Sequence, residues 1–268
     1  MTRQDRGPDG GHDGIAPRSQ LAGGELGRAW TGDGYDIHDH GGISGNDQTD
    51  TAAPRFDTGT TVVGVAIDEA VVMAADRRMS LGGRFTVNKS VRKVEQVHPT
   101  AAMGISGSVG PAQDLLRRLR AEASLYESRR GEAMSLDALA RTAGGLIRGL
   151  PVTPLLGGVE PEIEERGGAD GGDAEAARAR VYELDGGGSV LADDYAATGS
   201  GMQVAYGVLE RRYDRGASVE AAREAAVAAV AAASERDTAS GNGVTVTTVT
   251  GEGVETVARE EAAAGEVV

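Results

Sequence analysis

Three residues of this chain, Thr60, Asp76 and Lys93, have side chains whose chemistry suggests catalysis. A threonine at a free N-terminus carries its own base, because an α-amino group with a pKa of about 7.7–8 is substantially neutral near pH 7. Gly59 precedes Thr60, and glycine lets the backbone take the strained geometry that attack on its own peptide bond requires. Cleavage between Gly59 and Thr60 would create the nucleophile and its base together.

Asp76 and Lys93 supply opposite charges near this threonine in the sequence. Asp76 ends the second predicted strand, and Lys93 follows it in a chain whose 27 Lys and Arg residues include only two lysines, Lys89 and Lys93. A lysine beside the nucleophile favours the neutral amine and the developing alkoxide. Arginine cannot supply a compact ammonium that exchanges a proton, so a lysine here is informative. A surface lysine in a turn is the alternative for Lys93 taken alone.

Three clusters rich in glycine and small hydroxyl residues are further candidates for the catalytic site. Such loops expose backbone N–H groups and hydroxyls that can stabilise an anion. Any single one of them would usually be a plain turn. The clusters occupy residues 104–108, 198–201 and 236–241.

Other kinds of catalytic and metal site are disfavoured. The chain has no cysteine, which removes disulfides, thiolate metal sites and a cysteine nucleophile. His98 is the one histidine after residue 59; it precedes Pro99 in a predicted turn, and no G-x-S-x-G elbow precedes a helix, so a histidine triad is disfavoured. The Asp-Ile-His-Asp-His run at 36–40 could suggest a metal site, but no rigid element fixes a geometry there. We expect neither metal nor cofactor.

The predicted elements around these residues occur in blocks. Helices come in pairs between groups of strands, which favours an α+β fold with two antiparallel sheets between helical layers. Strands are predicted at 60–67, 70–75, 101–106, 152–159, 179–184, 244–250 and 254–258. Helices are predicted at 110–129, after a Ser135 cap to about 146, at 203–214 and, after a Ser218 cap, at 219–236.

The two ends of the chain and one internal stretch differ in composition from the rest. Residues 1–59 hold thirteen glycines, ten acidic residues and five arginines, which predicts a disordered prosegment. Residues 60–268 would form the folded domain, with an acidic surface insertion at 160–178 and a flexible tail at about 259–268.

The charge balance limits the partners. A formal net charge of −14 would be repelled by phosphate backbones, so nucleic acid is not expected. An acidic, lysine-poor composition is typical of proteins from a salt-loaded cytoplasm, with GC-rich codon bias as the alternative. No segment approaches the roughly 18 apolar residues of a membrane span, and the polar start is no secretory signal.

From residue 60 to about 250 the chain resembles the proteasome β-subunit family, of archaeal type. The resemblance implies a four-layer αββα sandwich of the N-terminal-nucleophile hydrolase class and threonine endopeptidase activity. It rests on TTVVG at 60–64, MAADRR at 73–78, the Lys93 segment, GISGSVGPAQDL at 104–115, ATGSG at 197–201, YGVLE at 206–210 and ERDTASGNG at 235–243.

Carried over to matching positions, the resemblance implies a role for each site residue. Thr60 would be the nucleophile and its amine the base, with Asp76 and Lys93 as the charged pair that orients it. The Gly107 amide would be the oxyanion donor. The residues holding the amine and its water would be Ser200, Asp237 and Ser240. The residues binding substrate would be Met79, Ser80, Val91, Ile105 and Val109, and their mostly apolar character suggests cleavage after hydrophobic residues.

The resemblance also implies partners and a maturation step. Seven-membered β rings would stack between α-subunit rings, and unfolded proteins would enter under the control of a regulatory ATPase in the cytoplasm. Removal of residues 1–59 by autocleavage would free the Thr60 amine.

Three departures from the family pattern stand out. The spacing from Asp76 to Lys93 is one residue longer than usual, so the segment 81–87 must bulge, and both the 160–178 insertion and the prosegment are long. One alternative is an inactive structural ring subunit, which the presence of Gly59, Thr60 and Lys93 disfavours. Another is a different N-terminal-nucleophile hydrolase, such as the bacterial proteasome-like peptidase or an amidase, which the RDTASG block disfavours.

Overall fold

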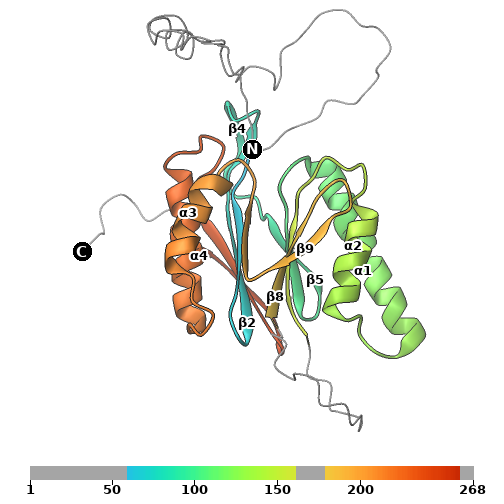
Figure 1. Ribbon diagram of the computed structural model, residues 1–268. Helices are drawn as coiled ribbons and strands as arrows, with labels where there is room; N and C mark the ends of the chain where they lie inside the picture. The colour runs from blue at the N-terminus through green and yellow to red at the C-terminus, as the bar shows by residue number, and fades with distance from the viewer. Residues whose placement is uncertain (1–58, 161–178, 260–268) are drawn as a thin grey trace, which may run out of the picture. The chain divides into compact units, whose positions relative to one another are not determined.

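The computed structural model describes residues 59–160 and 179–259 (Figure 1). The histidine run at 36–40, nearly all of the predicted prosegment and insertion, and most of the predicted tail lie outside the described residues.

Two five-stranded antiparallel sheets form the centre of the domain. The first has the order β10-β1-β2-β11-β12 and the second the order β5-β6-β7-β8-β9. The strands of the first sheet are β1 (Val62–Ala66), β2 (Ala70–Asp76), β10 (Tyr195–Thr198), β11 (Val244–Thr250) and β12 (Gly253–Arg259). The strands of the second are β5 (Val94–His98), β6 (Ala101–Gly104), β7 (Leu155–Val159), β8 (Ala179–Leu184) and β9 (Val190–Asp193).

A pair of helices covers the outer face of each sheet. The helices α1 (Val109–Arg130) and α2 (Leu136–Leu146) pack on the second sheet, and α3 (Met202–Arg212) and α4 (Val219–Ser234) pack on the first. Figure 1 shows the two pairs on opposite sides of the strands. The four-layer αββα sandwich expected from the sequence is therefore confirmed.

Local signals in the sequence explain where the helices begin. The Ser135 hydroxyl accepts a hydrogen bond from the Ala138 N–H, and the Ser218 hydroxyl accepts one from the Ala221 N–H, each at 3.3 Å. Both serines therefore cap their helices as expected. Leu125 of α1 is apolar but 42% exposed. It follows buried Ala123 by two residues, which turns it about 200° around the helix.

The space between the two sheets is filled by small side chains and by glycines. The cluster there consists mainly of alanines and valines, with Met73 and Leu155 as the larger members. A Cβ atom added to Gly104 would lie 2.4 Å from Val62 Cγ1, and one added to Gly157 would lie 2.8 Å from Val71 Cγ1. The sheets thus approach each other closely because these positions carry no side chain.

Several short strands were not predicted from the sequence. They are β5, β9, β10 and a separate two-stranded hairpin of β3 (Met79–Leu81) and β4 (Phe85–Asn88). The hairpin pairing is irregular between Met79 and Ser80, just before the segment where a bulge was expected. His98, expected in a turn, is the buried last residue of β5. The turn lies beyond it, at Pro99 and Thr100.

Candidate active site

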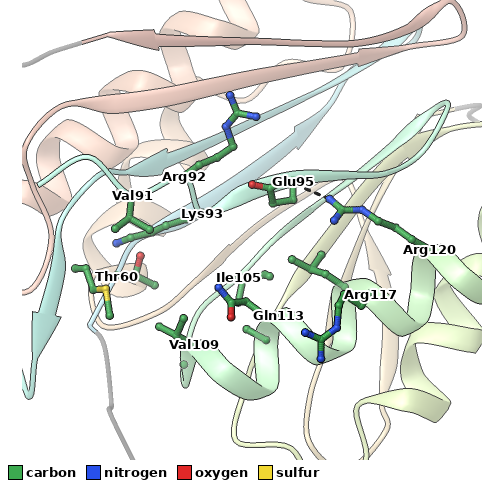
Figure 2. Close-up of a pocket in the computed structure, with 14 residues that line it drawn as sticks. Thr60, Val91, Arg92, Lys93, Glu95, Ile105, Val109, Gln113, Arg117 and Arg120 are labelled. Carbon is green, nitrogen blue, oxygen red and sulfur yellow. Dashed lines mark hydrogen bonds and ion pairs between the residues drawn. The ribbon is translucent and has the colours of Figure 1, made fainter. Parts of the chain in front are cut away.

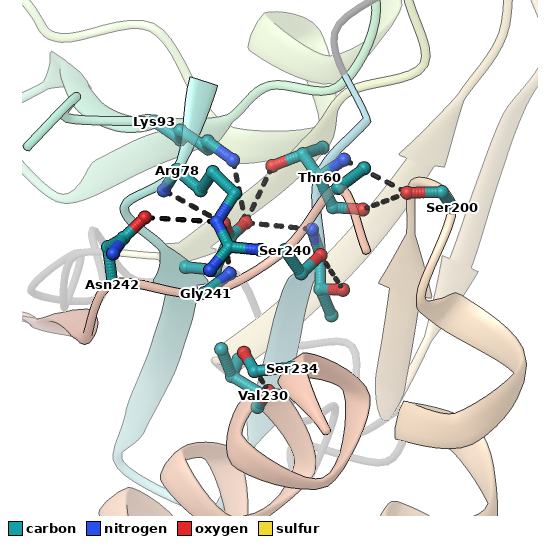
Figure 3. A network of polar contacts seen from close by, with 12 residues as sticks. Thr60, Arg78, Lys93, Ser200, Val230, Ser234, Ser240, Gly241 and Asn242 are labelled. Atoms are coloured by element: carbon teal, nitrogen blue, oxygen red, sulfur yellow. Dashed lines mark hydrogen bonds and ion pairs between the residues drawn. The ribbon is translucent and has the colours of Figure 1, made fainter. Parts of the chain in front are cut away.

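Thr60 lies directly before β1, beside the end of β2. These strands pair in an antiparallel hairpin with Val62 opposite Ala75, which brings the start of one next to the end of the other. The Thr60 hydroxyl donates a 2.9 Å hydrogen bond to Oδ1 of Asp76 (Figure 3). Both side chains are buried, so the hydroxyl is held in one orientation toward a carboxylate.

Five donors surround the Asp76 carboxylate. The Thr60 hydroxyl, the Thr61 N–H and the Lys93 ammonium donate to Oδ1 at 2.9, 2.9 and 2.6 Å. The N–H groups of Arg78 and Gly241 donate to Oδ2 at 3.0 and 2.9 Å. A carboxylate with this many donors can remain charged although it is fully buried.

Lys93 reaches Asp76 from the other sheet. It lies directly before β5, whereas Asp76 ends β2, so their ion pair joins the two sheets. Burial lowers the pKa of the Lys93 ammonium below its usual value, although the charge of Asp76 acts in the opposite direction. An ammonium with a lowered pKa gives up a proton more readily than an exposed lysine does.

The backbone nitrogen of Thr60 begins a second polar network. It donates to Ser200 Oγ at 3.1 Å, and Ser200 donates to Oδ2 of Asp237 at 2.6 Å. The Ser240 hydroxyl donates to the same carboxylate oxygen at 2.6 Å and lies 2.8 Å from Thr61 Oγ1. The three residues predicted to surround the Thr60 nitrogen are therefore brought together.

Gly59 has almost no free space around it. A Cβ atom added there would lie 2.0 Å from Ala239 Cβ and 3.0 Å from Ser200 Oγ. Glycine is required here because of crowding.

Gly107 follows β6 and is held against the segment 151–153. Its φ of 108° suits only glycine, and an added Cβ would lie 2.5 Å from the Pro151 carbonyl oxygen. The neighbouring Ser108 N–H donates to that oxygen, and the Thr153 N–H donates to the Ser106 carbonyl, both at 3.0 Å. The loop that carries Gly107 is thus fixed on both sides.

A cavity of about 410 Å³ opens beside Thr60 and Gly107. Four of the five predicted substrate-binding residues line it, and Figure 2 shows Thr60 at one end. The four are Met79, Val91, Ile105 and Val109. Ser80 does not line it: this residue is buried in β3, and its hydroxyl has no hydrogen-bond partner among the residues that the structure describes.

Comparison with known proteins agrees with this geometry. A family model described as Proteasome subunit matches residues 56–163 and 168–249. Proteasome subunit beta 2 of Haloterrigena turkmenica is 53% identical over 201 residues, which cover 74% of this chain and 78% of the relative. Proteasome subunit beta of Halorhabdus utahensis is 55% identical over 201 residues, covering 74% and 80%.

The chain belongs to the proteasome subunit family. The resemblance noted in the sequence is therefore confirmed, and these relatives are haloarchaeal, as the acidic, lysine-poor composition led us to expect. The two stretches matched by the family model are interrupted at 164–167, within the predicted insertion.

Within this proteasome subunit, the far end of the cavity is polar, which the sequence did not reveal. Arg120 binds Glu95 at 3.2 Å and also donates to the Gln96 carbonyl at 2.8 Å (Figure 2). Gln113, Arg117 and Arg120 share one face of α1 because they are spaced by four and three residues. That spacing is the signal that could have identified them.

The loop at 238–242 contains further residues that the sequence did not single out. Arg78 donates from Nε to the Asn242 side-chain oxygen at 3.0 Å and from Nη1 to the Thr238 carbonyl at 2.9 Å (Figure 3). Asn242 itself has a positive φ of 66°. These contacts hold the loop where the Gly241 N–H reaches Asp76.

Two other features are absent from residues 59–160 and 179–259, a metal-binding cluster and a membrane-spanning helix. Among these residues, no three His, Asp or Glu side chains are grouped so that they could hold a metal ion. None of the helices in the same part of the chain is both long and apolar enough to cross a membrane.

Proposed function

We propose that this proteasome subunit is catalytic, an N-terminal threonine endopeptidase that cleaves after apolar residues. One observation carries the proposal: the Thr60 hydroxyl, bonded to the buried Asp76–Lys93 pair, lies at the end of a largely apolar cavity. A hydroxyl in this position combines an activated nucleophile with a pocket for the side chain that precedes the scissile bond.

The first reaction is cleavage of the chain itself. The Thr60 hydroxyl gives up its proton as its oxygen attacks the Gly59 carbonyl carbon, the C–N bond breaks, and the departing Thr60 nitrogen takes up a proton. Water then hydrolyses the resulting ester, which leaves a carboxylate on Gly59 and a free amine on Thr60. The close packing of Gly59 against Ala239 and the hydrogen bond from the Thr60 N–H to Ser200 support this step, because they restrain both sides of the bond.

The mature enzyme repeats this chemistry on substrates. The Thr60 amine accepts the hydroxyl proton, directly or through water, while the oxygen attacks the substrate carbonyl. Lys93 stabilises the developing negative charge on the attacking oxygen, and the Gly107 amide stabilises that on the carbonyl oxygen. The peptide nitrogen leaves with a proton, and water hydrolyses the ester. Ser200, Asp237 and Ser240 orient the amine, which is consistent with the hydrogen bond that this nitrogen donates to Ser200 and with the hydrogen bonds from Ser200 and Ser240 to Asp237.

The substrates and partners follow from the family. We propose that this chain assembles with other β subunits in seven-membered stacked rings, with α subunits and, through them, a regulatory ATPase, and that it degrades unfolded proteins in the cytoplasm. The names of its relatives, proteasome subunit beta, support the assignment to the β type.

Replacing the nucleophile tests the proposal. Thr60→Ala should leave residues 1–59 attached and abolish hydrolysis of fluorogenic peptides with an apolar residue before the reporter. Thr60→Ser, which keeps a hydroxyl, should retain measurable processing. Mass spectrometry of the purified chains at high salt reads the N-terminus directly. Normal processing of Thr60→Ala would overturn the proposal, and an uncut, inactive wild-type chain in the assembled particle would favour a structural subunit.

A further inference from the structure

Thr61 links the two polar networks that surround Thr60. Its backbone N–H donates to Oδ1 of Asp76 at 2.9 Å, and its hydroxyl oxygen lies 2.8 Å from Ser240 Oγ. Asp76 orients the Thr60 hydroxyl, whereas Ser240 belongs to the network that begins at the Thr60 nitrogen. Thr61 is therefore bonded to both networks, although it does not line the cavity.

The direction of the hydrogen bonds in the second network follows from the number of hydrogens available. A hydroxyl has one hydrogen to donate, and an ionised carboxylate can only accept. Ser240 and Ser200 each lie 2.6 Å from Oδ2 of Asp237, so each gives its hydrogen to this oxygen, although the Thr60 carbonyl is a second, longer acceptor for Ser200 at 3.3 Å. The Ser200 oxygen is then left to accept from the Thr60 N–H. By the same count, the Ser240 oxygen accepts its hydrogen bond from the Thr61 hydroxyl.

The Thr61 hydroxyl lies where solvent cannot replace it. Thr61 and Ser240 are both 0% exposed. A Cβ atom added to Gly201 would lie 2.0 Å from Thr61 Oγ1, so the absence of a side chain at position 201 leaves room for this hydroxyl. If the hydroxyl were removed, the Ser240 oxygen would lose its donor in a buried place, and the hydrogen bond that Ser240 gives to Asp237 would weaken.

We propose that Thr61 is a positioning residue for the reaction: through its N–H and its hydroxyl, it holds the partners of the Thr60 nitrogen in a fixed place relative to Asp76. This inference rests on the proposed function, because it concerns the amine that cleavage would free. Since the hydrogen of Ser200 is given to Asp237, the mature amine donates one N–H to Ser200 and keeps its lone pair free for the hydroxyl proton. Thr61 acts through these groups and not through contact with the substrate.

Thr61→Val, which keeps the shape of the side chain and removes the hydroxyl, tests this role kinetically in assembled particles. We expect kcat for a fluorogenic peptide to fall by about tenfold, the effect of one lost buried hydrogen bond, while KM stays unchanged. The acid limb of the kcat profile should also move to higher pH, because Asp237 with a weaker donor stabilises the protonated amine more strongly. Thr61→Ser retains a hydroxyl and should restore most of the rate and the wild-type pH profile.

Thr247→Val is the matched control for this substitution. Thr247 is a buried threonine of β11 whose hydroxyl pairs with that of Thr256 at 3.0 Å, outside both networks, so its loss should change neither kcat nor the pH profile. A purely structural role of Thr61 would reduce the amount of active particle but leave the acid limb in place. The proposal would be overturned by an unchanged kcat in Thr61→Val, by a loss that Thr61→Ser does not restore, or by a loss without a shift of the acid limb.

Neutron diffraction tests the hydrogen-bond direction without any turnover. In deuterium-exchanged crystals of the assembled wild-type particle, we expect the hydroxyl deuterium of Thr61 to point to Ser240 and that of Ser240 to point to Asp237. A deuterium on Ser240 that points to Thr61 would overturn the inference. If the wild type showed no Thr60-dependent hydrolysis, the proposed function would fail, and the deuterium positions would still decide whether Thr61 is the donor to Ser240.

Discussion

The two sides of Thr60 are built in different ways. On one side, the Asp76 carboxylate is buried and receives five hydrogen bonds, three of them from backbone N–H groups. On the other side, separate side chains from the hairpin, β5, the loop after β6 and helix α1 line an open cavity. Backbone donors cannot be replaced one at a time, whereas each lining side chain can. We call the surroundings of Asp76 the polar side and the residues that line the cavity the cavity side. We therefore expect substitutions on the polar side to cause large losses of activity and those on the cavity side to cause smaller, graded losses.

Asp76→Asn should have the largest effect. An amide nitrogen cannot accept the hydrogen bonds that one carboxylate oxygen now receives, and the Lys93 ammonium would be left buried without its counter-charge. We expect peptide hydrolysis to fall by roughly 10²–10³-fold and the free energy of unfolding to fall by about 3–5 kcal/mol. Asp114→Asn, which removes the charge of a half-buried carboxylate that pairs with the exposed Arg117 and Arg118, is the control and should change stability by less than about 1 kcal/mol. Similar results for both variants would contradict the contrast between the two sides.

Gly59→Ala tests whether the close packing around Gly59 matters for cleavage of the Gly59–Thr60 bond. The added methyl group would collide with Ala239, so we expect processing at Thr60 to slow by about tenfold, the effect of a modest overpacking strain on a rate. Ala239→Gly removes the colliding atom, and the double variant should regain most of the rate. A time course of N-terminal processing by mass spectrometry measures both. Failure of the second substitution to restore processing would show that crowding by Ala239 is not the cause.

Ile105→Ala should have a smaller and more selective effect on the cavity side. Shortening an apolar side chain in the cavity lowers kcat/KM for substrates with leucine before the cut by about tenfold or less, while processing at Thr60 proceeds normally. A panel of peptides that differ only at that residue reads the change in preference. Leu125→Ala on the outer side of α1 should leave the panel unchanged. An equal loss of kcat/KM for all peptides would mean that Ile105 affects the reaction itself and not the substrate preference.

His98 should have the smallest effect, because it lies away from both sides of Thr60. Burial lowers the pKa of His98 below its usual value, with Glu127 and Glu160 acting in the opposite direction. At a pH between the lowered pKa of His98 in the folded chain and its usual pKa of about 6.5 in the unfolded chain, His98 is protonated only when the chain is unfolded. Stability therefore falls as the pH drops below about 6.5. We expect His98→Gln to reduce this acid-side slope in urea unfolding measured from pH 7.5 to 5.5. An unchanged slope would mean that other groups cause it.

The sequence was sufficient to predict the polar side because its residues adjoin regular elements. Thr60 and Asp76 stand at the two ends of a strand pair whose apolar runs are easily recognised, so their meeting follows from a tight hairpin. The scarcity of lysine directed attention to Lys93, which does form a buried ion pair. The catalytic roles of these residues remain predictions.

The features that were missed depend on information that a linear pattern lacks. The hairpin strands are short, glycine-interrupted and mostly exposed, so they show no alternation of buried and exposed residues. The polar end of the cavity depends on how α1 is rotated against β5, which tertiary packing decides. The need for glycine at position 59 comes from Ala239, which lies 180 residues away along the chain.

The glycines between the sheets have a consequence for the reactivity of this site. Thr60 and Asp76 adjoin strands of one sheet, whereas Lys93 and Gly107 adjoin strands of the other. In the proposed mechanism, the gap between the sheets therefore sets how far the Thr60 oxygen lies from the groups that would stabilise its charge. A methyl group at position 104 or 157 would push the two sheets apart, because it would collide with Val62 or Val71. If the proposed mechanism holds, such a change would lower activity by moving Lys93 and Gly107 away from Thr60, although no residue of the site is replaced.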